Sequence, residues 1–215
     1  MKAQLVVSEI LKESWKLVKS QIWILAGLFI AYILITSTIS IFSSPLQTSL
    51  IGGIISLVIS LFISSVFGVG YLKNMLQTID GDEPQFSAYM QSFPKILNYL
   101  LASIIFGVAT LIGTILFIVP GISLYIRLQF FGFFIVEENQ GAAESLRSSW
   151  EMTKDQGMPL ALLFLASILF LILGFILFII GVFVAYPFLW MIQAYTYRQL
   201  SQAVLMRQTE AVENV

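Results

Sequence analysis

The chain has 215 residues, of which 58% are hydrophobic and only 11% are charged, and its formal net charge is −1. Soluble proteins carry about 25% charged residues, so this composition excludes a protein whose whole surface faces water. The sequence has no cysteine and no histidine, which excludes disulfides, thiol catalysis, histidine acid–base catalysis and metal sites built from these residues.

The chain begins with an amphipathic stretch. Between residues 5 and 19, apolar side chains recur at helical spacing opposite a face of glutamates and lysines. A sharp polar face of this kind is typical of a helix that lies in the membrane interface. The apolar segment that follows, residues 22–42, is longer than the hydrophobic region of a secretion signal, and we interpret it as a retained span.

Six apolar segments reach or approach the length of about 20 residues that crosses the hydrocarbon of a bilayer. They are residues 22–42, 50–72, 96–119, 121–136, 159–180 and 182–198, of which the fourth is short. Tight reversals are expected at 119–121, where Pro120 and Gly121 break the chain, and at 180–182. The sequence therefore predicts an all-α, polytopic membrane bundle of about six transmembrane helices in three hairpins.

The distribution of positive charge predicts the orientation of the chain. The connections at residues 43–49, 119–121 and 180–182 carry no charge, whereas every lysine and arginine except Arg127 lies on the opposite side of the predicted spans. Because cytoplasmic loops carry an excess of positive charge, we expect both termini in the cytoplasm.

Two further amphipathic segments precede predicted hairpins. A short helix is expected over residues 84–92, with Phe86, Met90 and Phe93 on its apolar side, and a second helix over residues 142–155. With the first segment they give an interfacial cytoplasmic helix before each hairpin. Similar short motifs recur between these units, so we expect one membrane domain, residues 1–215, with internal repeats 1–73, 82–138 and 141–200.

Arg127 is the one charged residue placed within a predicted span. A guanidinium there costs at least about 2.5–3.5 kcal/mol unless it finds a partner or water. The functional interpretation is a site for an anion or a lipid phosphate, because the planar guanidinium suits phosphate oxygens. The structural interpretation is an arginine that bonds backbone groups left unpaired where the chain breaks around Pro120 and Gly121.

Polar side chains near Arg127 and in the last span are further candidates for binding a ligand. Gln193, Tyr197 and Arg198 give the last span a polar stripe that either lines a cavity or makes hydrogen bonds between helices. The ligand-binding candidates are Arg127, Gln129, Tyr125, Gln193 and Tyr197.

A polar patch is expected on the cytoplasmic side after the fourth span. Adjacent carboxylates could bind a cation or act as acid and base, but at a helix end they more often face water, and no second acidic cluster has metal-ligand spacing. Arg147 and Glu151 are four residues apart and can pair. The patch comprises Glu137, Glu138, Asn139, Glu144, Arg147 and Trp150, and we predict no metal site.

The region from residue 119 to 154 carries a resemblance to a known family. Its motifs are Val119-Pro120-Gly121, Arg127-Leu128-Gln129-Phe130, Ile135-Val136-Glu137-Glu138 and Gly141-Ala142-Ala143-Glu144-Ser145-Leu146-Arg147-Ser148-Ser149-Trp150. They resemble the membrane domain attached to some bacterial glycerophosphodiester phosphodiesterases, and related stand-alone prokaryotic membrane proteins of unknown function. Nothing resembles the soluble phosphodiesterase barrel, so the resemblance implies a prokaryotic membrane module without the hydrolase activity.

These observations favour a non-enzymatic module of the prokaryotic cytoplasmic (inner) membrane that binds, or helps to move, lipid or a small amphiphile. A small-solute transporter or channel and a membrane scaffold that recruits a cytoplasmic partner are the alternatives. An intramembrane lipid-modifying enzyme is less favoured, because the spans offer no histidine, cysteine or carboxylate as a base. We expect membrane lipids as partners, no nucleic acid and no cofactor, and leave open a homo-oligomer or a cytoplasmic partner protein.

Overall fold

The structure is a computed structural model that describes residues 5–176 and 178–213. Within these residues every regular element is a helix, as the sequence predicts. In chain order they are α1 (Val7–Ser43), η1 (Ser44–Thr48), α2 (Leu50–Asp80), α3 (Ser87–Gln91), η2 (Phe93–Lys95), α4 (Ile96–Leu116), α5 (Ile118–Leu128), α6 (Phe131–Glu138), α7 (Ala142–Met152), α8 (Gly157–Ile176) and α9 (Phe178–Glu213).

Five helical stretches in the described residues are long and apolar enough to cross a membrane. They correspond to the first five predicted spans, and the sixth, which falls in α9, is not among them. Many of their apolar side chains face outward, as Phe42 and Leu50 do at 79% and 83% exposure, although half of the fourth stretch is buried. Such exposure would be costly in water and fits contact with lipid.

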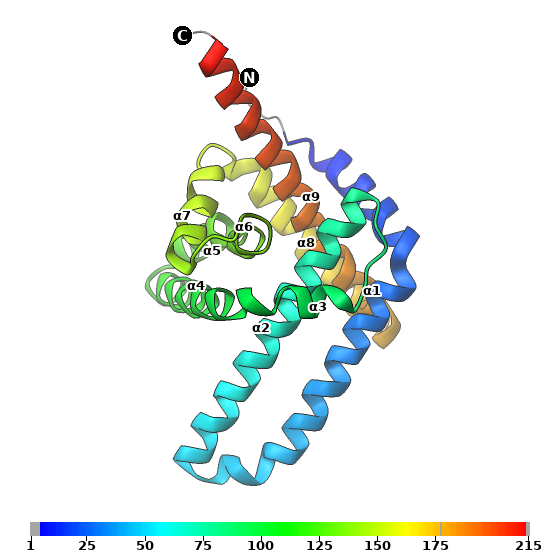
Figure 1. Cartoon of the computed structure of the whole chain (residues 1–215), viewed down its shortest axis with the longest axis vertical. Helices are drawn as coiled ribbons and strands as arrows, with labels where there is room; N and C mark the ends of the chain where they lie inside the picture. The colour runs from blue at the N-terminus through cyan, green and yellow to red at the C-terminus, as the bar shows by residue number, and fades with distance from the viewer. Residues whose placement is uncertain (1–4, 177, 214–215) are drawn as a thin grey trace.

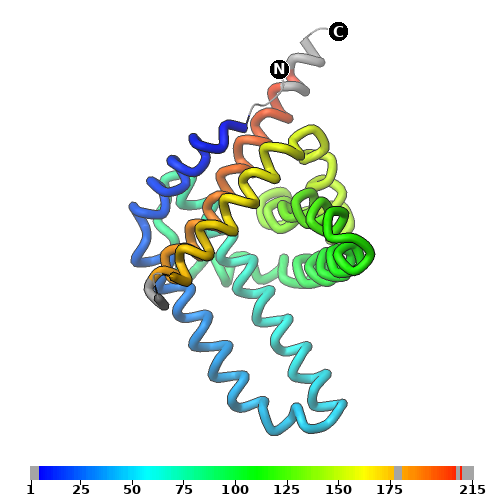
Figure 2. Tube along the Cα trace, turned by 180° about the vertical axis from the view of Figure 1, so that it is seen from behind, coloured from blue at the N-terminus to red at the C-terminus, as the bar shows by residue number. Residues whose placement is uncertain are grey.

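The helices form three contacting pairs, α1 with α2, α4 with α5 and α8 with α9. Figure 1 shows α1 and α2 as a long hairpin along the vertical axis, closed by η1, whereas α4 is seen nearly end-on. In the view from behind (Figure 2), the α4–α5 pair again points roughly along the line of sight. The pairs therefore point in different directions and meet at one end of the α1–α2 hairpin.

Helix α1 contains both the first amphipathic segment and the first predicted span. They meet at Gln21, whose backbone is not helical (φ −124°, ψ 19°). Before this kink, α1 runs beside α9 (Figures 1 and 2), and Ile10, Ser14 and Val18 are fully buried. The apolar side of the segment thus packs against protein, and its place in the membrane interface stays a prediction.

The fourth predicted span is interrupted. Helix α5 ends at Leu128 and α6 begins at Phe131, although residues Ile118–Glu138 together form one stretch that is long and apolar enough to cross a membrane. The Ser149 hydroxyl, on α7, donates to the carbonyl of Arg127 (2.7 Å) and accepts from the backbone N–H of Phe130 (3.1 Å). The hydroxyl of Thr153 also donates to the carbonyl of Arg127 (3.2 Å). Because these hydroxyls satisfy the freed backbone groups, the interruption is stable inside an apolar environment.

The reversal between α4 and α5 also differs from the expectation. The chain turns at Phe117, which is extended (φ −157°, ψ 136°), while Pro120 and Gly121 lie in the first turns of α5. Proline is tolerated there because the first helical N–H groups have no partner within the helix. The prediction that the backbone is broken at Pro120 and Gly121 is therefore wrong, since both residues are helical.

Helix α3 is shorter than predicted and begins at Ser87 instead of Pro84. Its predicted apolar side is turned outward, with Phe86, Met90 and Phe93 between 62% and 73% exposed. The main core lies among α2, α6 and α9, where Tyr71, Phe133 and Tyr197 are almost completely buried.

Candidate functional site

Two neighbouring cavities, called the two chambers of the central cavity below, share part of their lining. The smaller chamber, about 190 Å³, is lined by residues of α5, α8 and α9, with Phe130 at its edge. The larger, about 420 Å³, is lined by residues of α2, α4, α5, α6 and α9, with Gln129 between α5 and α6. Four residues line both chambers and form the wall between them: Tyr125, Gln129, Leu189 and Gln193.

The wall contains three of the five ligand-binding candidates of the sequence analysis. Tyr125, Gln129 and Gln193 are half-buried, and the Tyr125 hydroxyl lies within interacting range of the Gln193 amide. The Gln129 amide donates to the carbonyl of Ile126 (3.0 Å). Because each glutamine carries both donors and acceptors, the wall can offer hydrogen bonds of either direction to a bound molecule.

The two chambers differ in composition. In the smaller, aliphatic side chains are the largest group, beside rings such as Phe164 and polar side chains such as Ser167 and Thr196. The larger is mainly aromatic and also contains Ser103; its rings are Tyr99, Phe106, Tyr125, Phe131, Tyr186 and Trp190. Several of these rings contact one another, as Tyr99 and Phe131 do with centroids 5.4 Å apart.

Arg127 does not line either chamber. Its guanidinium lies over the ring of Trp150, 4.5 Å from the centroid. The sequence did not predict an aromatic partner for Arg127. Its role in binding a ligand stays a prediction, but the structure separates it from Gln129 and Gln193.

Tyr197 is fully buried and also lies away from the cavity. Its ring stacks on Phe133 with centroids 4.9 Å apart, and its hydroxyl donates to the carboxylate of Glu138 (3.3 Å). This candidate therefore joins the end of α6 to α9 instead of facing the chambers.

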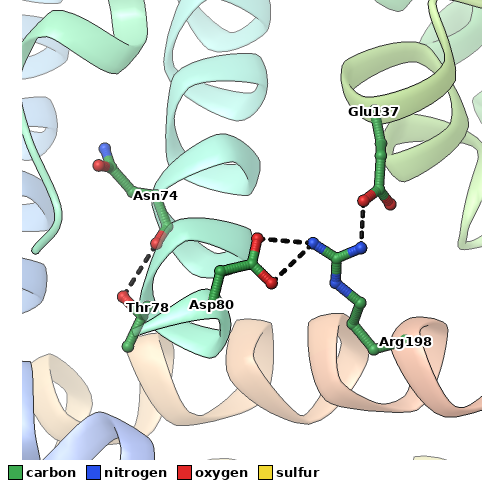
Figure 3. A network of polar contacts seen from close by, with 5 residues as sticks. All are labelled: Asn74, Thr78, Asp80, Glu137 and Arg198. Atoms are coloured by element: carbon green, nitrogen blue, oxygen red, sulfur yellow. Dashed lines mark hydrogen bonds and ion pairs between the residues drawn. The ribbon is translucent and has the colours of Figure 1, made fainter. Parts of the chain in front are cut away.

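An ion cluster of Asp80, Glu137 and Arg198 connects the ends of α2 and α6 to α9 (Figure 3). Arg198 donates to both carboxylate oxygens of Asp80, at 2.7 and 2.9 Å, and also to Glu137. Nearby in Figure 3, the Thr78 hydroxyl donates to the Asn74 carbonyl (2.9 Å) within α2. The sequence analysis missed this cluster, because Asp80 and Arg198 are 118 residues apart and no local pattern pairs them.

The residues of the predicted cytoplasmic patch have local partners. Asn139 ends α6 in a left-handed conformation (φ 56°, ψ 28°), and the carboxylate of Glu144 accepts from the N–H of Gly141 (3.4 Å) at the start of α7. Arg147 pairs with Glu151 at 2.8 Å as expected, and this hydrogen bond and charge raise the pKa of Arg147. Among the described residues, no group of acidic side chains gathers at metal-binding range.

Comparison with known families gives one match. The family described as "Domain of unknown function (DUF7847)" matches residues 42–212, so the chain belongs to this family. Neither a curated protein nor a solved structure matches the chain.

Proposed function

We propose that this member of the DUF7847 family is a non-enzymatic integral membrane protein that binds a lipid or another small amphiphile in its central cavity. The observation that carries the proposal is the meeting of Tyr125, Gln129 and Gln193 at the wall between the two chambers. Sites for small molecules are concave, mostly apolar and fitted with a few polar groups, and the cavity has this character.

The side chains that line the cavity favour binding over catalysis. They supply hydroxyls, amides and rings, and the chain has no histidine or cysteine that could act as a general base or nucleophile. Glutamine and serine alone are weak bases. A non-enzymatic role is therefore the simpler proposal.

For the membrane layout we propose six crossings in three hairpins, with α9 as the sixth span and both termini in the cytoplasm. The uncharged connections and the segregation of lysine and arginine support this orientation. The resemblance of residues 119–154 to membrane domains of bacterial glycerophosphodiester phosphodiesterases supports a prokaryotic cytoplasmic membrane. The three repeats are part of the same proposal.

Lipid retention tests the proposal. Purified protein should carry bound amphiphile that mass spectrometry detects after extraction. Ser103→Phe fills the larger chamber and Ser167→Phe the smaller, and each should remove most of the retained molecule by occupying its space. Ser123→Phe, on an exposed position of α5 outside the chambers, is the matched control and should retain it. Equal retention in all variants, with helical content unchanged, would contradict a site in the cavity.

One observation favours a second function as a scaffold. The last turns of α9 extend beyond the rest of the molecule (Figure 1), and Leu205 and Met206 on them are 59% and 65% exposed. An apolar face on a protruding helix can dock a partner. The two functions are compatible, because this face and the central cavity share no residue.

A further inference from the structure

We propose that the central cavity selects an uncharged amphiphile, whose polar part is rich in hydroxyl or ester groups, over one with an anionic head. This inference rests on the proposed function and names the class of ligand. Diacylglycerol represents the class in the experiment below.

The lining of both chambers is electrically neutral. No described residue that lines either chamber carries a formal charge, and the polar groups are amides and hydroxyls. An anionic head that entered would lose its hydration without gaining an opposite charge, which is costly in a medium of low dielectric constant. A neutral head loses less hydration and recovers hydrogen bonds from the same groups.

The nearby arginines are already engaged elsewhere. The Arg127 guanidinium lies over Trp150, and Arg198 is held by the carboxylates of Asp80 and Glu137. Neither lines a chamber. A phosphate in the cavity would therefore meet no cation, whereas the predicted phosphate site at Arg127 lies outside the chambers.

The lining of the two chambers suits both the apolar and the polar parts of such a ligand. Aliphatic side chains such as Leu163, Ile168 and Ile192 can contact part of an acyl chain in the smaller chamber. In the larger chamber, rings such as Tyr186 and Trp190 can pack against the carbon atoms of the ligand. Hydroxyls such as that of Ser103 can form hydrogen bonds with its polar groups. At the wall, Gln129 and Gln193 can bond the polar linkage that joins head and tail.

The experiment compares three lipids with identical acyl chains: dioleoylglycerol, dioleoylphosphatidic acid and dioleoylphosphatidylcholine. Each is titrated into the full chain in detergent micelles, and affinity is read from the shift in thermal unfolding. We expect dioleoylglycerol to bind at least about tenfold more tightly than phosphatidic acid, because only the phosphate lacks a partner. The phosphatidylcholine arm tests whether the aromatic rings bind its quaternary ammonium instead.

Substitutions of the residues between the two chambers test whether lipid selectivity arises there. Gln193→Met keeps the length of the side chain but removes its hydrogen bonds, and should weaken dioleoylglycerol about two- to tenfold. Gln202→Met, at an exposed position of α9 outside the chambers, should leave the affinity unchanged, as should Arg127→Gln. Gln193→Lys adds a cation to the wall and should shift the preference toward phosphatidic acid.

The outcomes separate this inference from the proposed function. Equal affinity for all three lipids, weakened together by Ser103→Phe, would keep the binding site and overturn its selectivity. Tighter binding of phosphatidic acid that Arg127→Gln abolishes would also overturn the selectivity. Tighter binding of phosphatidylcholine would identify a quaternary ammonium site and overturn the inference. No binding of any lipid would contradict both proposals.

Discussion

At the scale of single residues, Arg127 and Arg198 show two ways of holding a guanidinium among apolar helices. Arg127 lies over the face of Trp150, a contact that contributes about 0.5–2 kcal/mol depending on how far it is desolvated. Arg198 has two carboxylate partners, and its side chain is only 24% exposed. Because the Arg198 pairs join three helices, they should matter more for stability.

Removing Arg198 tests this difference. Arg198→Met leaves the carboxylates of Asp80 and Glu137 without their partner, and should lower the free energy of unfolding by about 1–3 kcal/mol. The matched control is Arg147→Met, which breaks the exposed pair with Glu151 and should cost much less, because water screens a pair on the surface. Denaturation in mixed micelles measures both, and equal losses would show that the ion cluster does not hold the helices together.

Some of the site could be predicted at this scale. Polar side chains in apolar segments are rare and expensive, and this signal singled out Tyr125, Gln129 and Gln193, which meet at the cavity. The same signal singled out Tyr197, which bonds Glu138 instead. The direction of a side chain depends on how helices cross, and one sequence does not define these crossings.

At the scale of elements, the turns of two helix pairs depend on glycine. A side chain at Gly121 would lie 2.5 Å from the backbone nitrogen of Thr114, and one at Gly181 would lie 2.2 Å from the carbonyl oxygen of Gly174. In both places a glycine lies directly against the backbone of the preceding helix. The repeat itself stays a prediction.

Alanine at Gly121 tests the close approach. Gly121→Ala places a methyl group against the backbone of α4, which cannot move aside as a flexible side chain would, and should destabilise the protein by about 1–3 kcal/mol. Gly107→Ala is the matched control, because nothing lies within 4 Å of its new Cβ and alanine favours helix. A thermal unfolding midpoint that falls equally for both would contradict tight packing at this turn.

The order of the helices was predictable, whereas the break in the fourth predicted span was not. Apolar runs and charge segregation indicated the helical segments now seen as α1, α2, α4, α8 and α9. The division into α5 and α6 depends on Ser149 and Thr153, which lie 19 to 26 residues further along the chain than the backbone groups they bond. Their hydroxyls satisfy backbone groups across space, and no local pattern reveals that role.

At the scale of the whole molecule, the divergent directions of the three helix pairs leave room for the central cavity. Closely packed parallel hairpins would fill this space with their own side chains. The sequence predicts the helices but not how they cross, which depends on contacts between distant segments, such as α1 with α9. The two chambers therefore could not be inferred before the structure.

The proposed orientation can be tested by labelling, since the chain has no cysteine of its own. Cysteine in place of Thr48, on the η1 connection, should react with an impermeant thiol reagent in intact cells, because this turn is expected outside. Cysteine in place of Gln140, between α6 and α7, should react only after the membrane is permeabilised. Labelling of Gln140→Cys alone in intact cells would invert the topology.

Photochemical labelling by an uncharged amphiphile tests the central claim, the binding site between the helix pairs, most directly. The probe is a monoacylglycerol with a diazirine in its acyl chain, and mass spectrometry maps the modified peptides. We predict labels on the part of α8 that includes Leu163 and Ile168 and on α9 near Ile192. An excess of unlabelled monoacylglycerol should suppress them. Labels confined to the outward faces of α1 and α2, and insensitive to competition, would contradict the account.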